Sequence, residues 1–210
     1  MMKAFTRITG TAIPFLEDDV NTDQIAPIGA GARITEDYAQ TLFRHRRRGA
    51  DGAEIPDFVF NQPQFCTGAT LVSGRNFGCG SSRESAVWTF LAIGVTCIIT
   101  RSFADMYREN CLQNGILPIT LPDAQADQLE AAVVAANGAA PFTVDLVSQE
   151  IMGPHGLRIT FDISPADRTR LLEGLDDIGL TLKHRADIEA FETRMAHETP
   201  WSQRADASSL

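Results

Sequence analysis

One loop combines the residue types that bind anions: residues 76–84 read Asn-Phe-Gly-Cys-Gly-Ser-Ser-Arg-Glu. It connects a predicted strand at residues 69–73 to a predicted helix at residues 82–93. Backbone N–H groups at a helix N-terminus have no intrahelical partner and lie at the positive end of the dipole, so a carboxylate or phosphate binds there favourably. Arg83 adds a planar guanidinium suited to two-pronged pairing with a carboxylate. The loop therefore predicts an anion site.

Three other interpretations of this loop explain less of it. A plain helix N-cap at Ser81 or Ser82 needs one serine and leaves the combination Gly-x-Gly-Ser-Ser-Arg unexplained. A dinucleotide loop needs a third glycine where Arg83 stands, and the next strand lacks a ribose-binding acid at its end. These two stay open as alternatives. A serine-hydrolase elbow is excluded, because neither serine is followed by glycine two residues later.

A second motif concentrates acids and amides in a turn. Residues 17–27 read Glu-Asp-Asp-Val-Asn-Thr-Asp-Gln-Ile-Ala-Pro and follow a short strand predicted at residues 11–16. Alone, this motif is equally well an Asx-rich turn. A third motif, Ser-Phe-Ala-Asp at residues 102–105, opens a predicted helix that is followed by Asn-Gly-Ile-Leu-Pro-Ile at residues 114–119.

Together the three motifs resemble those of the 3-isopropylmalate dehydratase small subunits, the isopropylmalate isomerases of leucine biosynthesis, which in turn resemble the mobile C-terminal domain of aconitase. The resemblance runs from about Phe5 to about Phe191 and includes residues 56–61 and 175–182. Gly-Ser-Ser-Arg-Glu and Asn-Thr-Asp mark the aconitase superfamily, whereas residues 179–184 are closer to the isopropylmalate branch. The resemblance implies an α/β fold, a three-layer β/β/α swivelling domain.

The resemblance also implies a role for each site residue. Ser81 is the base, acting as an alkoxide, while Arg83 and Asp23 complete the catalytic set; the substrate-binding positions are Ser82, Gly80, Arg33 and Gly29. A serine is a poor base unless its anion is stabilised. One arginine at about 4 Å contributes about 4 kcal/mol at an effective dielectric of 20, or about three pKa units. The loop amides, the helix dipole and the metal site must therefore contribute as well.

The resemblance further implies a [4Fe–4S] cluster, held by three cysteines, as the Lewis acid. The cysteines of this chain form no Cys-x-x-Cys pair and are predicted to be buried thiols, with only Cys79 exposed enough to react: Cys66, Cys79, Cys97 and Cys111. We therefore expect no metal site on this chain. The cluster is expected on a large partner subunit over which this chain closes.

Two departures from the family pattern concern the substrate. Residues 27–33 read Pro-Ile-Gly-Ala-Gly-Ala-Arg, where the family commonly carries lysine and bulky apolar residues, and Ser85 stands where a histidine usually follows. Isopropylmalate is the favoured substrate, and another alkylmalate of the methylmalate or dimethylmalate type is the alternative. We expect residues 28–33 to decide which malate is accepted. A non-catalytic anion-binding module is the alternative from a different functional class.

Composition and charge indicate a single cytoplasmic domain. At 210 residues and 44% hydrophobic content, the chain can bury a core without disulfides. No signal peptide is evident, and the longest nearly apolar run, residues 86–99, is shorter than the roughly 20 residues that span a bilayer. A net charge of −9 argues against nucleic acid as a partner. We expect one domain at residues 1–197 and a mobile tail at residues 198–210.

The remaining pattern predicts the elements that position the motifs. Strands at residues 69–73, 95–100 and 116–121 alternate with helices, which predicts right-handed crossovers and a parallel core. We predict a further helix at residues 123–137, then a strand pair at 142–147 and 157–162 joined by a polar loop. Two more helices follow, one opened by Ser164-Pro165 and a final one near 186–197. The basic run at residues 44–48 is a solvated helix end or a partner contact. Weaker carboxylate candidates are Arg75, Arg101 and Arg108. We expect His155 and His184 to be structural or surface residues and not ligands.

Overall fold

Two four-stranded sheets form the body of the molecule. The computed structural model describes residues 2–27 and 38–202. One sheet is parallel, in the order β2 (Ala12–Phe15), β3 (Thr70–Ser73), β4 (Cys97–Thr100) and β5 (Leu117–Thr120). The other is antiparallel, in the order β1 (Arg7–Gly10), β6 (Phe142–Asp145), β7 (Glu150–Met152) and β8 (Arg158–Thr160).

Alternating side chains of the parallel sheet fill two cores. Val72 and Ile99 pack toward the antiparallel sheet, together with Phe142 and Ile151. The intervening residues face the other way, because successive side chains of a strand point to opposite faces. Ile98 thus packs in the second core with residues of the helices α4 (Ser85–Ala92) and α5 (Asp105–Gln113). The predicted β/β/α layering is confirmed, with the parallel sheet in the middle.

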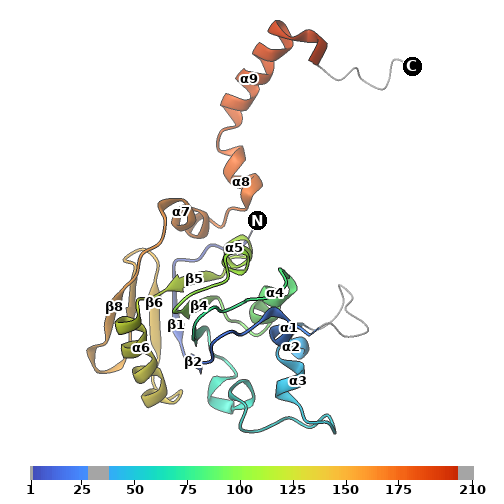
Figure 1. Cartoon of the computed structure of the whole chain (residues 1–210). Coiled ribbons are helices and arrows are strands. Elements are labelled where there is room, and N and C mark those ends of the chain that lie inside the picture. The colour runs from blue at the N-terminus through green and yellow to red at the C-terminus, as the bar shows by residue number, and fades with distance from the viewer. Residues whose placement is uncertain (1, 28–37, 203–210) are drawn as a thin grey trace.

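The helices divide between the body and an extension. Figure 1 shows α4 and α5 on one side of the parallel sheet and the antiparallel strands on the other. The helices are α1 (Thr22–Ile25), α2 (Tyr38–Thr41), α3 (Arg44–Arg47), α4 (Ser85–Ala92), α5 (Asp105–Gln113), α6 (Asp123–Ala136), α7 (Pro165–Glu173), α8 (Asp177–Leu182) and α9 (Arg185–Glu198). Short 3₁₀ turns lie at Val59–Asn61, Pro63–Phe65, Pro154–Gly156 and Pro200–Ser202. In the part of the chain that the structure describes, no helix is long and apolar enough to cross a membrane.

The parallel core, its crossovers and the two late helices agree with the sequence predictions, but the antiparallel sheet does not. The predicted strand pair is wrong: β6 and β8 do not pair, because β7 lies between them and bonds to both. The expected polar loop thus contains a strand. Strand β1 was not predicted at all, since its residues alternate between half-buried and exposed and its partner, β6, is distant in sequence.

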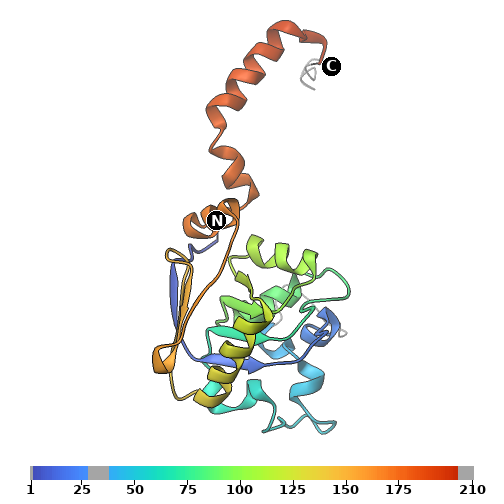
Figure 2. The same cartoon turned by 60° about the vertical axis from the view of Figure 1, so that its left-hand side comes forward.

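Residues 177–202 form an arm that projects from the body. Helices α8 and α9 extend away from both sheets in two views (Figures 1 and 2), and none of the described side chains of the arm is buried. Ion pairs join its beginning to α7, from Asp177 to Arg170 at 2.5 Å and from Lys183 to Glu173 at 2.5 Å. The predicted domain boundary at residue 197 falls within the last turn of α9. Mobility of residues 198–210 stays a prediction, and residues 203–210 lie outside the described part.

Candidate active site

Two segments that leave the carboxyl edge of the parallel sheet are hydrogen-bonded along their length. Beyond β2 and β3, the Gly78 N–H donates to the Val20 carbonyl at 2.8 Å and the Thr22 N–H donates to the Cys79 carbonyl at 2.9 Å. The Thr22 hydroxyl then donates to the Ser81 carbonyl at 2.6 Å. These bonds bring the Asn-Thr-Asp motif beside the glycine-serine loop. The two motifs singled out in the sequence therefore form one site.

A third segment, after β4, joins the same arrangement from the other side. The Phe77 N–H donates to the Ser102 carbonyl at 3.0 Å, and the Ala104 N–H donates back to the Phe77 carbonyl at 3.0 Å. Phe77 is fully buried. We call residues 17–23, 74–84 and 101–104 the site edge. Because carboxyl ends of parallel strands meet at one edge of a sheet, side chains from three loops converge there.

An ion pair between Asp23 and Arg83 lies on the site edge. Nη1 of Arg83 is 2.5 Å from Oδ1 of Asp23, with side-chain exposures of 21% and 60%. This buried nitrogen has no well-aligned hydrogen bond among the described residues. Because the two atoms are so close, the Asp23 carboxylate orients the guanidinium and partly neutralises its positive charge. Because this carboxylate neutralises part of the charge, Arg83 stabilises an alkoxide less than an unpaired arginine would.

Ser81 and Ser82 are exposed in a bend before α4. The predicted helix start at residue 82 is wrong, since α4 begins at Ser85 and has no side-chain cap. Gly80, at φ +88°, and the bond from Thr22 to the Ser81 carbonyl hold the bend in a non-helical path. Neither serine caps the helix, so the plain-cap interpretation is wrong and both hydroxyls remain at the surface.

Helix α5 supports this loop through two asparagines that sequence reasoning missed. The Asn110 amide donates to the Ser82 hydroxyl at 3.4 Å, and the Asn114 amide donates to the Glu84 carboxylate at 2.9 Å. The Asn114 side-chain oxygen accepts from the Trp88 indole at 2.9 Å, which ties α5 to α4. One feature of the sequence could have identified them: Asn110 and Asn114 are four residues apart, which places both amides on one face of a helix.

Gly78 lets the loop lie flat on a buried tyrosine. A Cβ built at Gly78 would be 2.1 Å from Cγ of Tyr107, and φ is +77°, a conformation that favours glycine. Tyr107 is 1% exposed, and burial raises the pKa of its phenol well above the ordinary value. Its hydroxyl approaches the Ala86 carbonyl at 3.5 Å. The ring is a neutral packing surface under the loop.

The cysteines do not form a cluster site. Cys97 and Cys111 are buried, and burial raises the pKa of both thiols. Cys79 is half-buried, with its pKa raised first by desolvation and then by the Asp19 carboxylate. Cys66 is exposed, which contradicts its predicted burial: it follows the Pro63–Phe65 turn at the surface. Among residues 2–27 and 38–202, no group of His, Cys, Asp or Glu side chains fits a metal ion, so these residues do not suit an iron–sulfur cluster.

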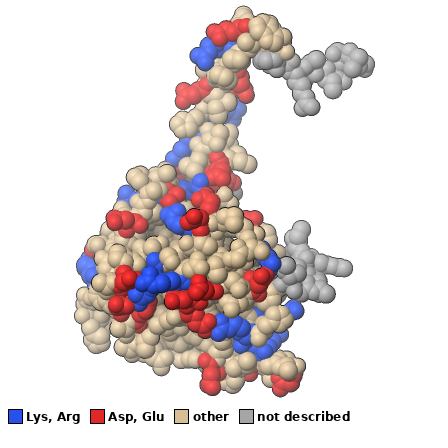
Figure 3. All heavy atoms as spheres, viewed as in Figure 1, with Lys and Arg blue, Asp and Glu red and all other residues tan. Residues whose placement is uncertain are grey.

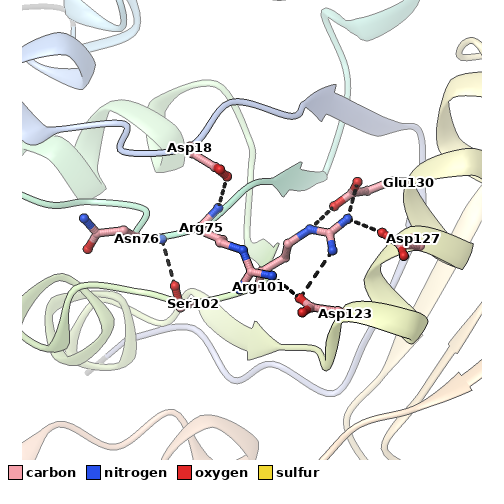
Figure 4. A network of polar contacts seen from close by, with 8 residues as sticks. All are labelled: Asp18, Arg75, Asn76, Arg101, Ser102, Asp123, Asp127 and Glu130. Atoms are coloured by element: carbon pink, nitrogen blue, oxygen red, sulfur yellow. Dashed lines mark hydrogen bonds and ion pairs between the residues drawn. The ribbon is translucent and has the colours of Figure 1, made fainter.

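The three weaker arginine candidates are paired with carboxylates of the chain itself. Figure 4 shows Arg75 and Arg101 beside α6, where Arg101 contacts Glu130 at 2.8 Å and both arginines contact Asp123. Arg101 donates hydrogen bonds to Glu130 and Asp127, and these bonds raise the pKa of its guanidinium. Arg108 pairs with Asp167 at 3.0 Å. Arg75 and Arg101 thus attach α6 to the loops after β3 and β4, whereas Arg108 joins α5 to α7. His155 and His184, predicted to be structural or surface residues, are exposed.

The basic run is only partly solvated. Arg46 binds Glu17 through two contacts of 2.6 Å, and its guanidinium lies over Phe15 and Phe58, 5.3 Å from each ring centroid. Arg47 donates to the side chain of Asn61 at 2.8 Å. The prediction of a solvated helix end therefore fits the exposed residues Arg44 and His45 but not the rest of the run. Blue atoms in Figure 3 gather at the lower right of the body, where Figure 1 places α3.

Two predicted substrate-binding residues, Gly29 and Arg33, lie in residues 28–37, outside the described part of the chain. The other predicted site residues, Asp23, Gly80, Ser81, Ser82 and Arg83, all lie on the site edge. Ser85 is half-buried at the first position of α4. The loop expected to select the substrate therefore stays a prediction, whereas the anion-binding motif has a defined geometry.

Family models match most of the chain. The model described as the aconitase C-terminal domain matches residues 2–124. The model described as LeuD_N matches residues 127–165. A third model, which describes the C-terminal domain of the 3-isopropylmalate dehydratase small subunit, matches residues 177–205, which include the arm.

Named relatives match the chain over nearly its whole length. The 3-isopropylmalate dehydratase small subunit of Rhodospirillum centenum is 46% identical over 207 residues, covering 96% of this chain and 99% of the relative. That of Parvibaculum lavamentivorans is 44% identical over 201 residues, covering 95% and 100%. A crystal structure of 3-isopropylmalate dehydratase from Methanocaldococcus jannaschii is 26% identical, with a TM-score of 0.59, and covers 89% of this chain and 99% of that one. The resemblance seen in the motifs is confirmed, and the chain belongs to the family of 3-isopropylmalate dehydratase small subunits, in the aconitase superfamily.

Proposed function

We propose that this chain is the small subunit of a two-subunit hydro-lyase that isomerises 2-isopropylmalate to 3-isopropylmalate in leucine biosynthesis, in the cytoplasm. The observation that carries the proposal is the site edge, where exposed Ser81 and Ser82 lie on the loop whose Arg83 is oriented by Asp23. Family membership supports the substrate, since the relatives carry the name of this enzyme.

The reaction requires an acid–base group and a Lewis acid. A proton leaves the carbon next to a carboxylate and hydroxide leaves the neighbouring carbon, giving an unsaturated diacid; water then adds with the opposite regiochemistry. Ser81 takes and returns the carbon-bound proton, because its hydroxyl is exposed on the loop that also carries Arg83. The Lewis acid belongs to a [4Fe–4S] cluster on the large subunit, since the described residues of this chain offer no ligand set for it.

Arg83 binds a substrate carboxylate with the donors that Asp23 leaves free. A guanidinium carries five N–H donors in a rigid fork, and the ion pair uses one edge of it. Asp23 acts as a positioning group, since its carboxylate holds Nη1 at 2.5 Å. Ser82 and the backbone at Gly80 line the same loop and complete the anion site. The intact set argues against a non-catalytic module, which has no use for an oriented guanidinium beside two exposed hydroxyls.

The test is anaerobic co-expression with the large subunit, followed by an ultraviolet assay for the unsaturated acid. We expect turnover of isopropylmalate by the wild-type pair, and faster turnover than with a methylmalate. Ser81→Ala removes the base, so kcat falls by at least about 100-fold with little change in KM or in assembly of the two subunits. Ser148→Ala, an exposed serine in the β6–β7 turn, is the matched control and retains full activity. Normal turnover by Ser81→Ala contradicts the assignment of the base.

A further inference from the structure

Asn76 joins all three segments of the site edge. Its side-chain amide donates to Oδ1 of Asp19 at 2.7 Å, which reaches the segment after β2. Its backbone N–H donates to the Ser102 hydroxyl at 2.8 Å, in the segment after β4 (Figure 4). Asn76 itself belongs to the segment after β3. One residue therefore sets the spacing of three loops.

The contact between Asn76 and Asp19 joins two tight turns. Both residues have left-handed backbone conformations, with φ of 52° and 55°. Asn and Asp are the non-glycine residues that adopt this region most readily, because their short polar side chains bond locally. The Asp19 N–H donates to the Arg75 carbonyl at 2.9 Å, so the two turns are bonded through backbone as well as side chains. The side-chain bond therefore fixes one turn against the other.

The position of these turns determines where the catalytic motifs meet. Immediately after Asp19, fully buried Val20 accepts from the Gly78 N–H, and the chain then enters the motif that ends in Asp23. Immediately after Asn76, the other segment enters the loop that carries Arg83. A shift between the turns thus changes the register of Asp23 against Arg83. We propose that Asn76 is a positioning residue that holds these two motifs in register; its catalytic consequence rests on the proposed function.

The test exchanges the two partners of the side-chain bond. Asn76→Asp sets two carboxylates against each other, and we expect kcat/KM of the two-subunit enzyme to fall at least about tenfold. Asp19→Asn alone stays within about twofold, since the new amide oxygen still accepts from Asn76. The double variant restores a donor and an acceptor in exchanged positions, so activity returns to within about threefold of wild type.

Two further variants separate positioning from general damage. Asn76→Gly keeps the left-handed backbone and removes the amide without adding charge, and we expect a loss of about fivefold. Asn137→Asp is the matched control, because Asn137 has the same backbone conformation, at φ 43°, on the exposed end of α6. It leaves kcat/KM within about twofold of wild type.

A second measurement uses the small subunit alone. The amides of Gly78 and Thr22 bond across the two segments, so their hydrogen exchange reports the opening of the site edge. We expect exchange at least about fivefold faster in Asn76→Asp and Asn76→Gly, and near-normal exchange in the double variant. Unchanged exchange in both single variants overturns the proposal, as does a double variant that recovers neither readout. If the wild-type pair fails to convert isopropylmalate, the proposed function fails, and the exchange data still decide the role of Asn76.

Discussion

The site edge and the arm are built by opposite means. The site edge has little regular secondary structure, but its three segments are bonded to one another and rest on buried Phe77 and Tyr107. The arm is almost entirely helical, and none of its described side chains is buried. Ion pairs at its beginning attach it to α7.

The difference shows that a segment with regular secondary structure is not necessarily held in place by the rest of the fold, and that an irregular segment can be. A helix satisfies most of its own backbone groups, so the backbone of α9 needs no hydrogen bonds from the body. The loops of the site edge satisfy theirs only through each other, so their geometry depends on contacts between segments far apart in sequence. We therefore expect large effects from substitutions that break the packing or the bonds between segments of the site edge, and a stable body after changes to the arm.

The largest effect is expected from Gly78→Ala. The new Cβ lies 2.1 Å from Cγ of Tyr107 at a positive φ, so backbone and ring must both shift. We expect the free energy of unfolding to fall by at least about 3 kcal/mol, measured as a lower urea midpoint. Gly52→Ala is the control, because φ there is +81° but no atom lies within 4 Å. It costs about 1 kcal/mol, and equal losses at both positions would show that the Tyr107 contact is unimportant.

Arg83→Lys tests the electrostatic part of the site edge. The ammonium keeps the charge but cannot bind Asp23 and a substrate carboxylate through one planar fork. We expect kcat/KM with isopropylmalate to fall at least about 100-fold, equivalent to about 2.7 kcal/mol. Arg158→Lys, an exposed arginine paired with Glu150, serves as the control and changes little. A loss below about fivefold would mean that charge alone suffices.

Removal of residues 177–210 tests whether the arm contributes to the stability of the body. Among described residues, the arm contributes no buried side chain. The ion pairs to α7 that are lost have exposed arm partners, with Asp177 60% and Lys183 42% exposed, so each pair is worth about 0–1 kcal/mol. We expect the unfolding free energy of the body to change by no more than about 1 kcal/mol in urea titrations. Asp177→Asn removes only the ion pair to Arg170, so it measures how much of the change in unfolding free energy comes from that pair. A decrease above about 2 kcal/mol would assign the arm a part in the core.

The smallest effect concerns Cys79. The Asp19 carboxylate raises the pKa of its thiol, so Asp19→Asn lowers that pKa. The thiolate fraction at a fixed pH below the pKa then rises, and alkylation speeds up by about twofold to threefold at pH 8. The measurement uses Cys66→Ser to remove the exposed thiol, with Asp187→Asn on the arm as the control. A slower or unchanged rate would contradict the electrostatic influence of Asp19.

The elements that can be predicted from the sequence are those in which every residue is buried, because they appear as continuous apolar runs. Strands β3 and β4 are buried at every position and read as short apolar runs, so the crossovers around them were predictable. Ser164 caps α7, as its motif predicts, by accepting from the Asp167 N–H at 3.1 Å. Strands β1 and β7 are short and partly polar; β1 forms by pairing with β6, and β7 forms by pairing with β6 and β8. Such long-range pairing has no local signature.

The candidate site was predictable in composition but not in geometry. The motifs identify Asp23 and Arg83, but their ion pair depends on the parallel register of two distant segments. The sequence predicts the start of α4 at residue 82, because a serine there resembles a helix cap. The helix begins at Ser85 instead, because Thr22 binds the Ser81 carbonyl and holds the chain in a non-helical path. Asn110 belongs to no motif, and Asn114 is only the first residue of the segment at 114–119, with no predicted role in the site. Tertiary hydrogen bonds decide each of these cases, and local patterns carry no information about them.

The bonds between the loops also determine when the chain loses conformational entropy. Fixing one residue of backbone costs about 1–2 kcal/mol, so a loop as long as residues 76–84 loses on the order of 10 kcal/mol when it becomes ordered. In this chain that loss occurs during folding, because the loop is bonded to its neighbours within the same molecule. In the proposed two-subunit enzyme, association then proceeds with this loop already ordered, so the free energy of contact between the subunits is not spent on ordering it.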